Sequence, residues 1–129
     1  MITQRDPKSI AREFNEYINS QNLEGQGGLM SEDHVFIDRE GNIQRSKKVM
    51  VQNWKKFFSM FPHYRNTFTR MESRENLVVI LGHAYWSEDN PRDPAIWTAK
   101  ITDGRVSEWR VYADTRENRF TFNLAGATG

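Results

Sequence analysis

The chain has 129 residues, enough for one hydrophobic core, and we expect residues 1–129 to form a single domain with its core over about 7–114. Its formal net charge is +1 with 27% charged residues, so the sequence lacks the basic surface typical of nucleic-acid binders. It contains no cysteine, which excludes disulfides, thiolate metal sites and thiol nucleophiles.

Neither a targeting segment nor a membrane span is predicted. The opening sequence M-I-T-Q-R-D-P lacks the apolar core of a signal peptide, and no apolar run approaches the length of a transmembrane helix. We therefore expect a cytoplasmic protein that interacts with neither membranes nor nucleic acid.

The first part of the chain contains one clear helix and one doubtful one. Asp6 followed by Pro7 combines a helix cap with proline at the first helical position, and the apolar residues that follow predict a helix over about residues 7–21. Residues 22–33 have the length of a short second helix. The three glycines in that segment would each cost about 1 kcal/mol inside a helix, so its helicity stays open.

A short strand and a third helix follow. Residues 34–38 are expected to form the strand, and the sequence D-R-E-G from Asp38 has turn composition. Ser46 can cap a helix that ends before Pro62. Its apolar residues share one face: Met50, Trp54, Phe57, Phe58 and Phe61.

From Tyr64 onward the apolar period changes from helical to strand-like. Residues 64–72 and 77–87 are predicted to be long strands joined by a turn at 73–76. A proline-bearing loop then leads into residues 95–114, which we expect to form a β-hairpin.

This hairpin is the strongest local prediction in the chain. Its centre, Asp103-Gly104, suits a two-residue turn that needs positive φ. Alternation gives it one apolar, tryptophan-bearing face and one polar or amphipathic face. Trp97 and Trp109 are expected on the concave side of the sheet, facing the helix that carries Trp54 and Phe58.

After Asp114 the pattern weakens. Residues 115–124 fit either a short strand or an irregular tail, and the final A-G-A-T-G is expected to be disordered. The order of elements predicts an α+β fold, with helices packed on one face of a mostly antiparallel sheet.

With these elements in place, the chain resembles the nuclear transport factor 2-like superfamily, and within it the SnoaL-like and ketosteroid-isomerase-like small proteins, over about residues 8–114. The resemblance rests on a first helix ending in N-L-E, then L-M-S-E-D-H-V-F-I-D, an aromatic helix closing at F-P-H-Y-R, and the ending D-G-R-V-S-E-W-R-V-Y-A-D. It implies a cone-shaped roll, in which three N-terminal helices pack inside a strongly bent sheet, with a pocket at one end and often a homodimer through the sheets. The superfamily hosts isomerases, cyclases, dehydratases, hydrolases and adaptors, so the reaction does not follow from the fold.

The resemblance also carries individual residues across. Asp38 aligns with the aspartate that shuttles the proton in steroid isomerases, and Trp109 falls at a pocket-lining position. Phe14 stands where the isomerases have an oxyanion-hole tyrosine, and Trp97 where they have a second aspartic acid. The acid of the SnoaL-type cyclases would fall near Val111. Neither the usual isomerase chemistry nor the usual cyclase chemistry is therefore expected.

Asp38 and His83 are the candidate catalytic residues. Asp38 is either a solvated turn-former or a pocket acid, and His83 is either a half-exposed strand histidine or a second polar group facing Asp38. His34 shares the face of Asp38 by strand alternation. The spacing of these three residues does not support a metal site, and no phosphate loop or dinucleotide motif is present, so neither a metal nor another cofactor is expected.

The expected pocket is aromatic, and its ligand is expected to be a small hydrophobic molecule. Its candidate residues are Phe14, Tyr17, Phe36, Trp54, Phe58, Trp97 and Trp109.

Two functions stay open. One is a cofactor-independent isomerase, cyclase or dehydratase acting on a hydrophobic carbonyl compound, with Asp38 moving the proton. The other is a non-catalytic ligand-binding or dimerisation module. The convex face, with Tyr112 and either Tyr85 or Trp86, carries more apolar surface than solvation requires, which predicts a two-fold homodimer.

Overall fold

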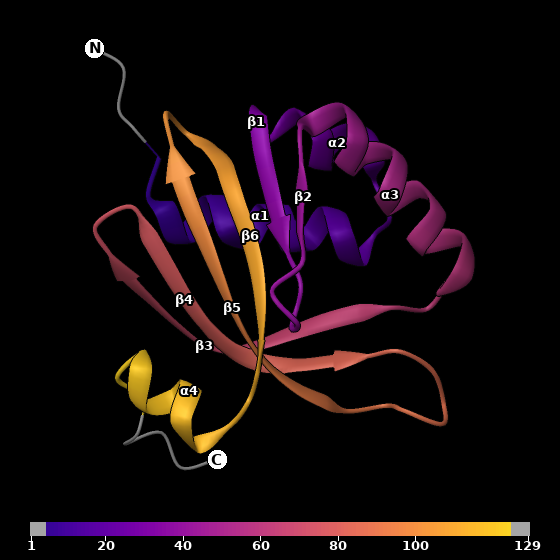
Figure 1. The fold of residues 1–129 in the computed structure, drawn as a ribbon. Helices are drawn as coiled ribbons and strands as arrows, with labels where there is room; N and C mark the ends of the chain where they lie inside the picture. The colour runs from indigo at the N-terminus through magenta and orange to yellow at the C-terminus, as the bar shows by residue number, and fades with distance from the viewer. Residues whose placement is uncertain (1–4, 125–129) are drawn as a thin grey trace.

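The computed structural model describes residues 5–124 as a curled six-stranded sheet with four helices (Figure 1). The elements in chain order are α1 (Pro7–Asn19), α2 (Leu23–Gly28), β1 (Met30–Ile37), β2 (Ile43–Arg45), α3 (Lys47–Met60), β3 (Arg65–Arg74), β4 (Leu77–Tyr85), β5 (Asp93–Thr102), β6 (Arg105–Ala113) and α4 (Arg116–Thr121). The strand order is β2-β1-β6-β5-β4-β3, and only β1 and β6 run parallel. The predicted class, an α+β roll with a mostly antiparallel sheet, is confirmed.

The first helix forms as predicted and ends slightly earlier. The Asp6 carboxylate accepts a hydrogen bond from the Lys8 amide at 3.1 Å, and the apolar face of α1 is fully buried against the sheet. The second helix, which the sequence left open, also forms. A side chain at Gly25 would lie 2.5 Å from the Tyr17 ring, so this glycine is needed for α2 to pack closely on α1.

The third helix begins where the sequence indicates. The Ser46 hydroxyl accepts a hydrogen bond from the Val49 amide at 3.2 Å, and α3 ends at Met60, just before Pro62. Its aromatic side chains form an edge-packed cluster; the Trp54 and Phe57 rings, for example, lie 5.4 Å apart.

The strand predicted over 34–38 is longer in the structure and has a partner that the sequence did not predict. β1 starts at Met30, and the fully exposed β2 pairs with its end, Val35 opposite Arg45. An exposed three-residue edge strand has no buried face, so it leaves no apolar alternation to find.

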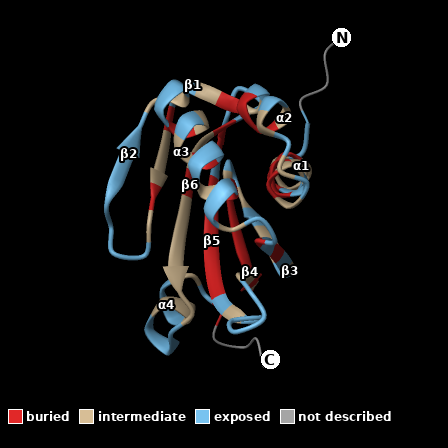
Figure 2. Cartoon of the chain, turned by 90° about the vertical axis from the view of Figure 1, so that its right-hand side faces the viewer, coloured by how far each residue is buried: buried red, intermediate tan, exposed pale blue. Residues whose placement is uncertain are grey.

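The hairpin prediction is confirmed by β5 and β6. The turn residues Asp103 and Gly104 have φ of 52° and 76°, as a two-residue hairpin turn requires. Trp97 and Trp109 lie in the same buried cluster as Trp54 and Phe58, which confirms their place on the concave face. Figure 2 shows how strongly burial is concentrated on β4 and β5.

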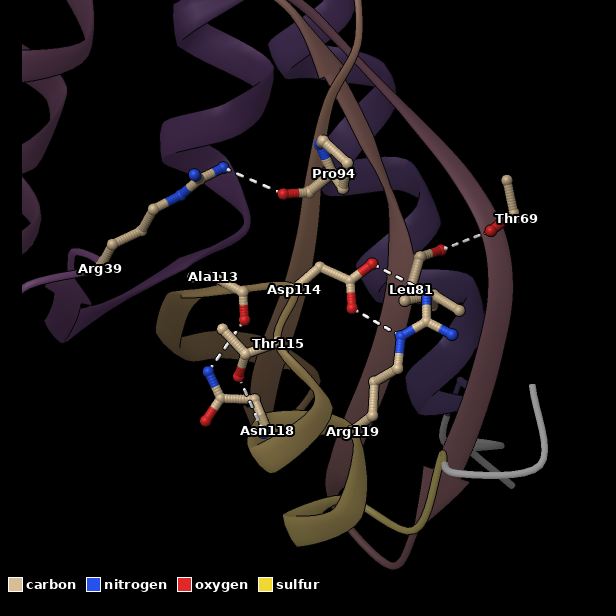
Figure 3. Close-up of polar contacts among 9 residues, drawn as sticks. All are labelled: Arg39, Thr69, Leu81, Pro94, Ala113, Asp114, Thr115, Asn118 and Arg119. Atoms are coloured by element: carbon tan, nitrogen blue, oxygen red, sulfur yellow. Dashed lines mark hydrogen bonds and ion pairs between the residues drawn. The ribbon is translucent and has the colours of Figure 1, made fainter. Parts of the chain in front are cut away.

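Residues 115–124 are neither a strand nor an irregular tail. They form α4 and a final turn, capped by the Thr115 hydroxyl. The Asn118 side chain donates to the Ala113 carbonyl at the end of β6, and Arg119 forms an ion pair with Asp114, the residue after β6 (Figure 3). Figure 1 shows α4 on the side of the sheet opposite α1. The predicted disorder of the last five residues falls outside the described range.

This C-terminal segment covers part of the convex face. Leu124 is fully buried in a cluster with Val79, Leu81 and Ile96, and the rings of Phe122 and Tyr112 pack 4.9 Å apart. Some of the apolar surface that motivated a homodimer therefore packs within the chain itself. The homodimer stays a prediction.

Candidate functional site

A cavity of about 570 Å³ opens on the concave side of the sheet. Its wall combines α3, the turn after β1, and the parts of β4, β5 and β6 nearest that turn. The lining residues are Phe36, Asp38, Arg39, Glu40, Gln44, Met50, Asn53, Trp54, Lys56, Phe57, Met60, Tyr64, Ala84, Trp86, Asp93, Trp97, Trp109 and Val111.

Every tryptophan of the sequence lies in this wall. Trp54 comes from α3, Trp97 and Trp109 come from the floor of the sheet, and Trp86 follows β4. Phe36 extends the same surface, with its ring 6.1 Å from that of Trp54. These five aromatic side chains, far apart in the sequence, therefore line the same cavity.

Four of the seven expected pocket residues line the cavity: Phe36, Trp54, Trp97 and Trp109. The other three lie behind or beside them. The Phe14 ring packs 4.9 Å from Trp109, and Phe58 packs 5.5 Å from Trp54. Tyr17 donates its hydroxyl hydrogen to Glu13 on α1 at 2.9 Å. Helical periodicity found the apolar face of each helix but could not show which of its residues reach the cavity.

Asp38 lies in the cavity wall and also organises the turn after β1. Its Oδ1 accepts hydrogen bonds from the amides of Glu40 at 3.0 Å and Asn42 at 2.9 Å, and its Oδ2 accepts one from the Asn42 side chain at 3.1 Å. Burial alone would raise the pKa of Asp38, but these hydrogen bonds outweigh it and lower the pKa below the usual value. Asp38 is thus a turn-former that also lines the cavity, and its role as a pocket acid stays a prediction.

Of the two alternatives that the sequence left open for His83, the structure fits the half-exposed strand histidine and does not bring this residue to Asp38 as a second polar group. His83 is opposite Pro94 and alternates with Gly82 and Ala84 on β4, so it lies on the convex face with Leu81. It is not among the cavity-lining residues.

His34 is a core residue. It is fully buried, its Nδ1 donates to the Val106 carbonyl at 2.6 Å, and its ring lies 5.9 Å from that of Phe14. Burial lowers the pKa of His34, although the Val106 carbonyl and Asp33 act in the opposite direction. Its burial and its hydrogen bond to the Val106 carbonyl are those of a neutral histidine in the core.

Sequence reasoning missed the ion pair between two cavity-lining residues, Arg39 and Asp93. Arg39 forms a two-pronged ion pair with Asp93, with Nη1–Oδ1 and Nη2–Oδ2 distances of 3.2 and 2.8 Å. It also donates to the Pro94 carbonyl at 3.4 Å, the contact that Figure 3 draws. The Trp86 indole donates to Asp93 Oδ2 at 3.0 Å. These contacts join the β1–β2 turn to the start of β5, far apart in sequence, and no local pattern indicates them.

Tyr64 adds a further polar group to the wall. It is 7% exposed, and burial raises the pKa of its hydroxyl, so the hydroxyl stays protonated near neutral pH.

Within residues 5–124, no cluster of three or more histidine, aspartate or glutamate side chains is arranged as metal ligands. Across the same part of the chain, every helix is too short or too polar to cross a membrane.

Comparison with known proteins gives one family match. A model of the SnoaL-like domain family matches residues 11–114. No curated protein sequence matches the chain.

Solved structures with the same fold have little sequence identity to this chain. A nuclear transport factor 2-like protein of unknown function from Cytophaga hutchinsonii is similar with a TM-score of 0.73 and 17% identity, over 93% of this chain and 99% of that one. A candidate SnoaL-like polyketide cyclase from Shewanella putrefaciens gives 0.75 and 14%, over 92% and 88%. A candidate ketosteroid isomerase from Kribbella flavida gives 0.72 and 15%, over 87% and 85%. Likeness at this identity establishes the fold alone.

Proposed function

Because the chain belongs to the SnoaL-like domain family of the nuclear transport factor 2-like superfamily, we propose that it is a small-molecule pocket protein whose ligand is a hydrophobic carbonyl compound. The observation that carries the proposal is that all four tryptophans line one cavity of about 570 Å³. Clefts that hold small organic molecules typically measure about 300 to 1,000 Å³ and are lined by aromatic side chains with a few polar groups.

The distribution of polar residues supports an oriented ligand. The tryptophan-bearing floor offers apolar area to a flat ring system, whereas Asp38, Arg39 and Asp93 lie together in the wall near the β1–β2 turn. A ligand with one apolar part and one oxygen-bearing part matches this arrangement.

A direct binding measurement tests the proposal. The bicyclic ketone 2-tetralone should change the intrinsic tryptophan fluorescence in a saturable way, because a bound ketone lies against the tryptophans. Val111→Phe adds a ring to the cavity wall and should weaken binding at least about tenfold.

The neighbouring Tyr112 provides the matched control. Its side chain packs against Phe122 on the convex face, so Tyr112→Phe should leave the affinity unchanged. Absence of saturable binding, or equal affinity in the Val111→Phe variant, would contradict the proposal.

A second function, proton transfer at a carbon next to the carbonyl, is supported by the place of Asp38 in the wall. A carboxylate can take such a proton if it reaches the carbon. The hydrogen bonds that lower the pKa of Asp38 also make it a weaker base, so we expect slow exchange rather than a fast isomerase.

Deuterium exchange tests this second function. Wild type should accelerate exchange of the α-protons of 2-tetralone in D2O, followed by proton NMR, and Asp38→Asn should abolish the acceleration. Asparagine keeps a carbonyl oxygen for the Glu40 and Asn42 amides, so the turn should survive. Unchanged exchange in a variant that still binds 2-tetralone would leave only the non-catalytic binding function.

A further inference from the structure

Tyr64, just before β3, lines the cavity and has a hydroxyl that the fold does not use. Its ring is held edge-on between the rings of Phe57 and Trp86, each with its centre 4.8 Å away. Among residues 5–124, no side chain or carbonyl accepts a hydrogen bond from the Tyr64 hydroxyl. A hydroxyl donor without an acceptor, in a wall rich in aromatic rings, calls for an explanation.

This hydroxyl is open to water. Of the donors in the same wall, the indole nitrogens of Trp54 and Trp97 are closed to water and without a partner, whereas the Tyr64 hydroxyl is not. The nearby Asn66 side chain is not its partner, because neither polar atom of that side chain forms a hydrogen bond. Tyr64 is otherwise 93% buried, so its hydroxyl meets water where the residue lines the cavity.

The Tyr64 hydroxyl lies in the polar part of the cavity. Its pKa is governed first by burial, but the charges of Arg39 and Asp93 also act on it, so both charged groups are near the hydroxyl. Trp86 connects these groups, because its ring packs on Tyr64 and its indole donates to Asp93 at 3.0 Å. The proposed function places the oxygen of the ligand in this same part of the wall.

We propose that Tyr64 determines the ligand class by donating its hydroxyl hydrogen to the carbonyl oxygen of the bound compound. This inference rests on the proposed function and names the residue that recognises the oxygen. The hydroxyl has one hydrogen to donate, and a carbonyl oxygen can accept it. Burial raises the pKa of Tyr64, so the hydroxyl stays protonated and remains a donor near neutral pH.

This donor makes the cavity selective for ligands with an acceptor. When a ligand fills the cavity, the Tyr64 hydroxyl loses its contact with water, and only a ligand with an acceptor replaces that hydrogen bond. A site that offers a hydrogen bond therefore rejects an analogue lacking the matching group. The proposal predicts preference for a ketone over the hydrocarbon of the same skeleton.

A matched pair of probes tests the proposal. Affinities of 2-tetralone and of its hydrocarbon analogue tetralin are measured by calorimetry for wild type and Tyr64→Phe. Phenylalanine keeps the ring that packs on Phe57 and Trp86 and removes only the hydroxyl. We expect wild type to favour the ketone, and the variant to lower the ketone-to-hydrocarbon affinity ratio about three- to tenfold, the worth of one hydrogen bond.

Infrared spectroscopy of bound 2-tetralone gives a second readout that a purely structural role of Tyr64 would not move. A hydrogen bond to the carbonyl oxygen lowers the frequency of the carbonyl stretch. The carbonyl band of the bound ketone should therefore lie at higher frequency in Tyr64→Phe than in wild type.

Tyr112→Phe is the control, because it removes the same hydroxyl from a tyrosine that packs on Phe122 on the convex face. Its affinity ratio and carbonyl band should equal those of wild type. If wild type binds both probes and Tyr64→Phe keeps the wild-type ratio, this inference is wrong while the proposed function stands. If wild type binds neither probe, the proposed function fails and this inference fails with it.

Discussion

Leu124 offers the sharpest test of how the C-terminal segment contributes to stability. Its side chain is fully buried against Val79, Leu81 and Ile96 on the convex face of the sheet. Leu124→Ala removes three buried carbon atoms, each worth about 0.8 kcal/mol, and leaves a space beside the sheet. We expect the free energy of unfolding to fall by about 2 to 3 kcal/mol, at the lower end of the range for such changes.

Urea denaturation followed by circular dichroism measures this loss, with the slope of the transition expected to stay the same. Phe120 in the same segment is 78% exposed, so Phe120→Ala is a matched control that should change stability by less than about 0.5 kcal/mol. If Leu124→Ala were no more destabilising than Phe120→Ala, the segment would not be packed on the sheet as described.

Two further predictions concern the core. Burial lowers the pKa of His34 below its usual value of 6.5, so the unfolded chain binds a proton more readily than the folded one, and the free energy of unfolding should fall as the pH drops below about 6.5. His34→Gln can still donate to the Val106 carbonyl but cannot titrate, so the free energy of unfolding of this variant should fall less than that of wild type as the pH drops. If urea denaturation gave the same pH dependence for both proteins, His34 would not be the titrating group. Gly82→Ala places a methyl group 2.0 Å from the Thr67 carbonyl oxygen on β3, so one strand must shift. We expect the free energy of unfolding, measured by urea denaturation, to fall by about 1 to 3 kcal/mol or more. A variant as stable as wild type would mean that β3 and β4 lie further apart than described.

Elements with a strong local pattern were predictable. Asp6-Pro7, Ser46 and Asp103-Gly104 mark a helix start, a second helix start and a hairpin turn through chemistry within a few residues, and the structure confirms all three. Strand alternation likewise placed Trp97 and Trp109 on the correct face.

Features that depend on distant contacts were not predictable. α4 has no buried residue of its own, and the side chain that anchors the segment, Leu124, lies beyond the helix end, so the sequence shows no amphipathic period there. β2 is exposed along its whole length and is held only by pairing with β1.

The candidate site also has features that could be predicted from the sequence and features that could not. Its aromatic character was visible in the sequence, and Asp38 was found through the resemblance to steroid isomerases. The Arg39–Asp93 contact was missed because it joins a turn and a strand start that approach only in the folded sheet. The side of His83 stayed open, because alternation along a strand does not state which face is concave, and the structure places it on the convex face.

The most direct test of the central claim is a two-dimensional nitrogen–proton NMR spectrum of the tryptophan side chains during titration with 2-tetralone. The four indole N–H resonances report on one cavity, because all four tryptophans line it. Binding in the cavity predicts that all four shift and saturate together with one dissociation constant. If the indole resonances stay in place, or if the shifts are confined to backbone amides away from the cavity, the claim that this aromatic space is the ligand site is contradicted.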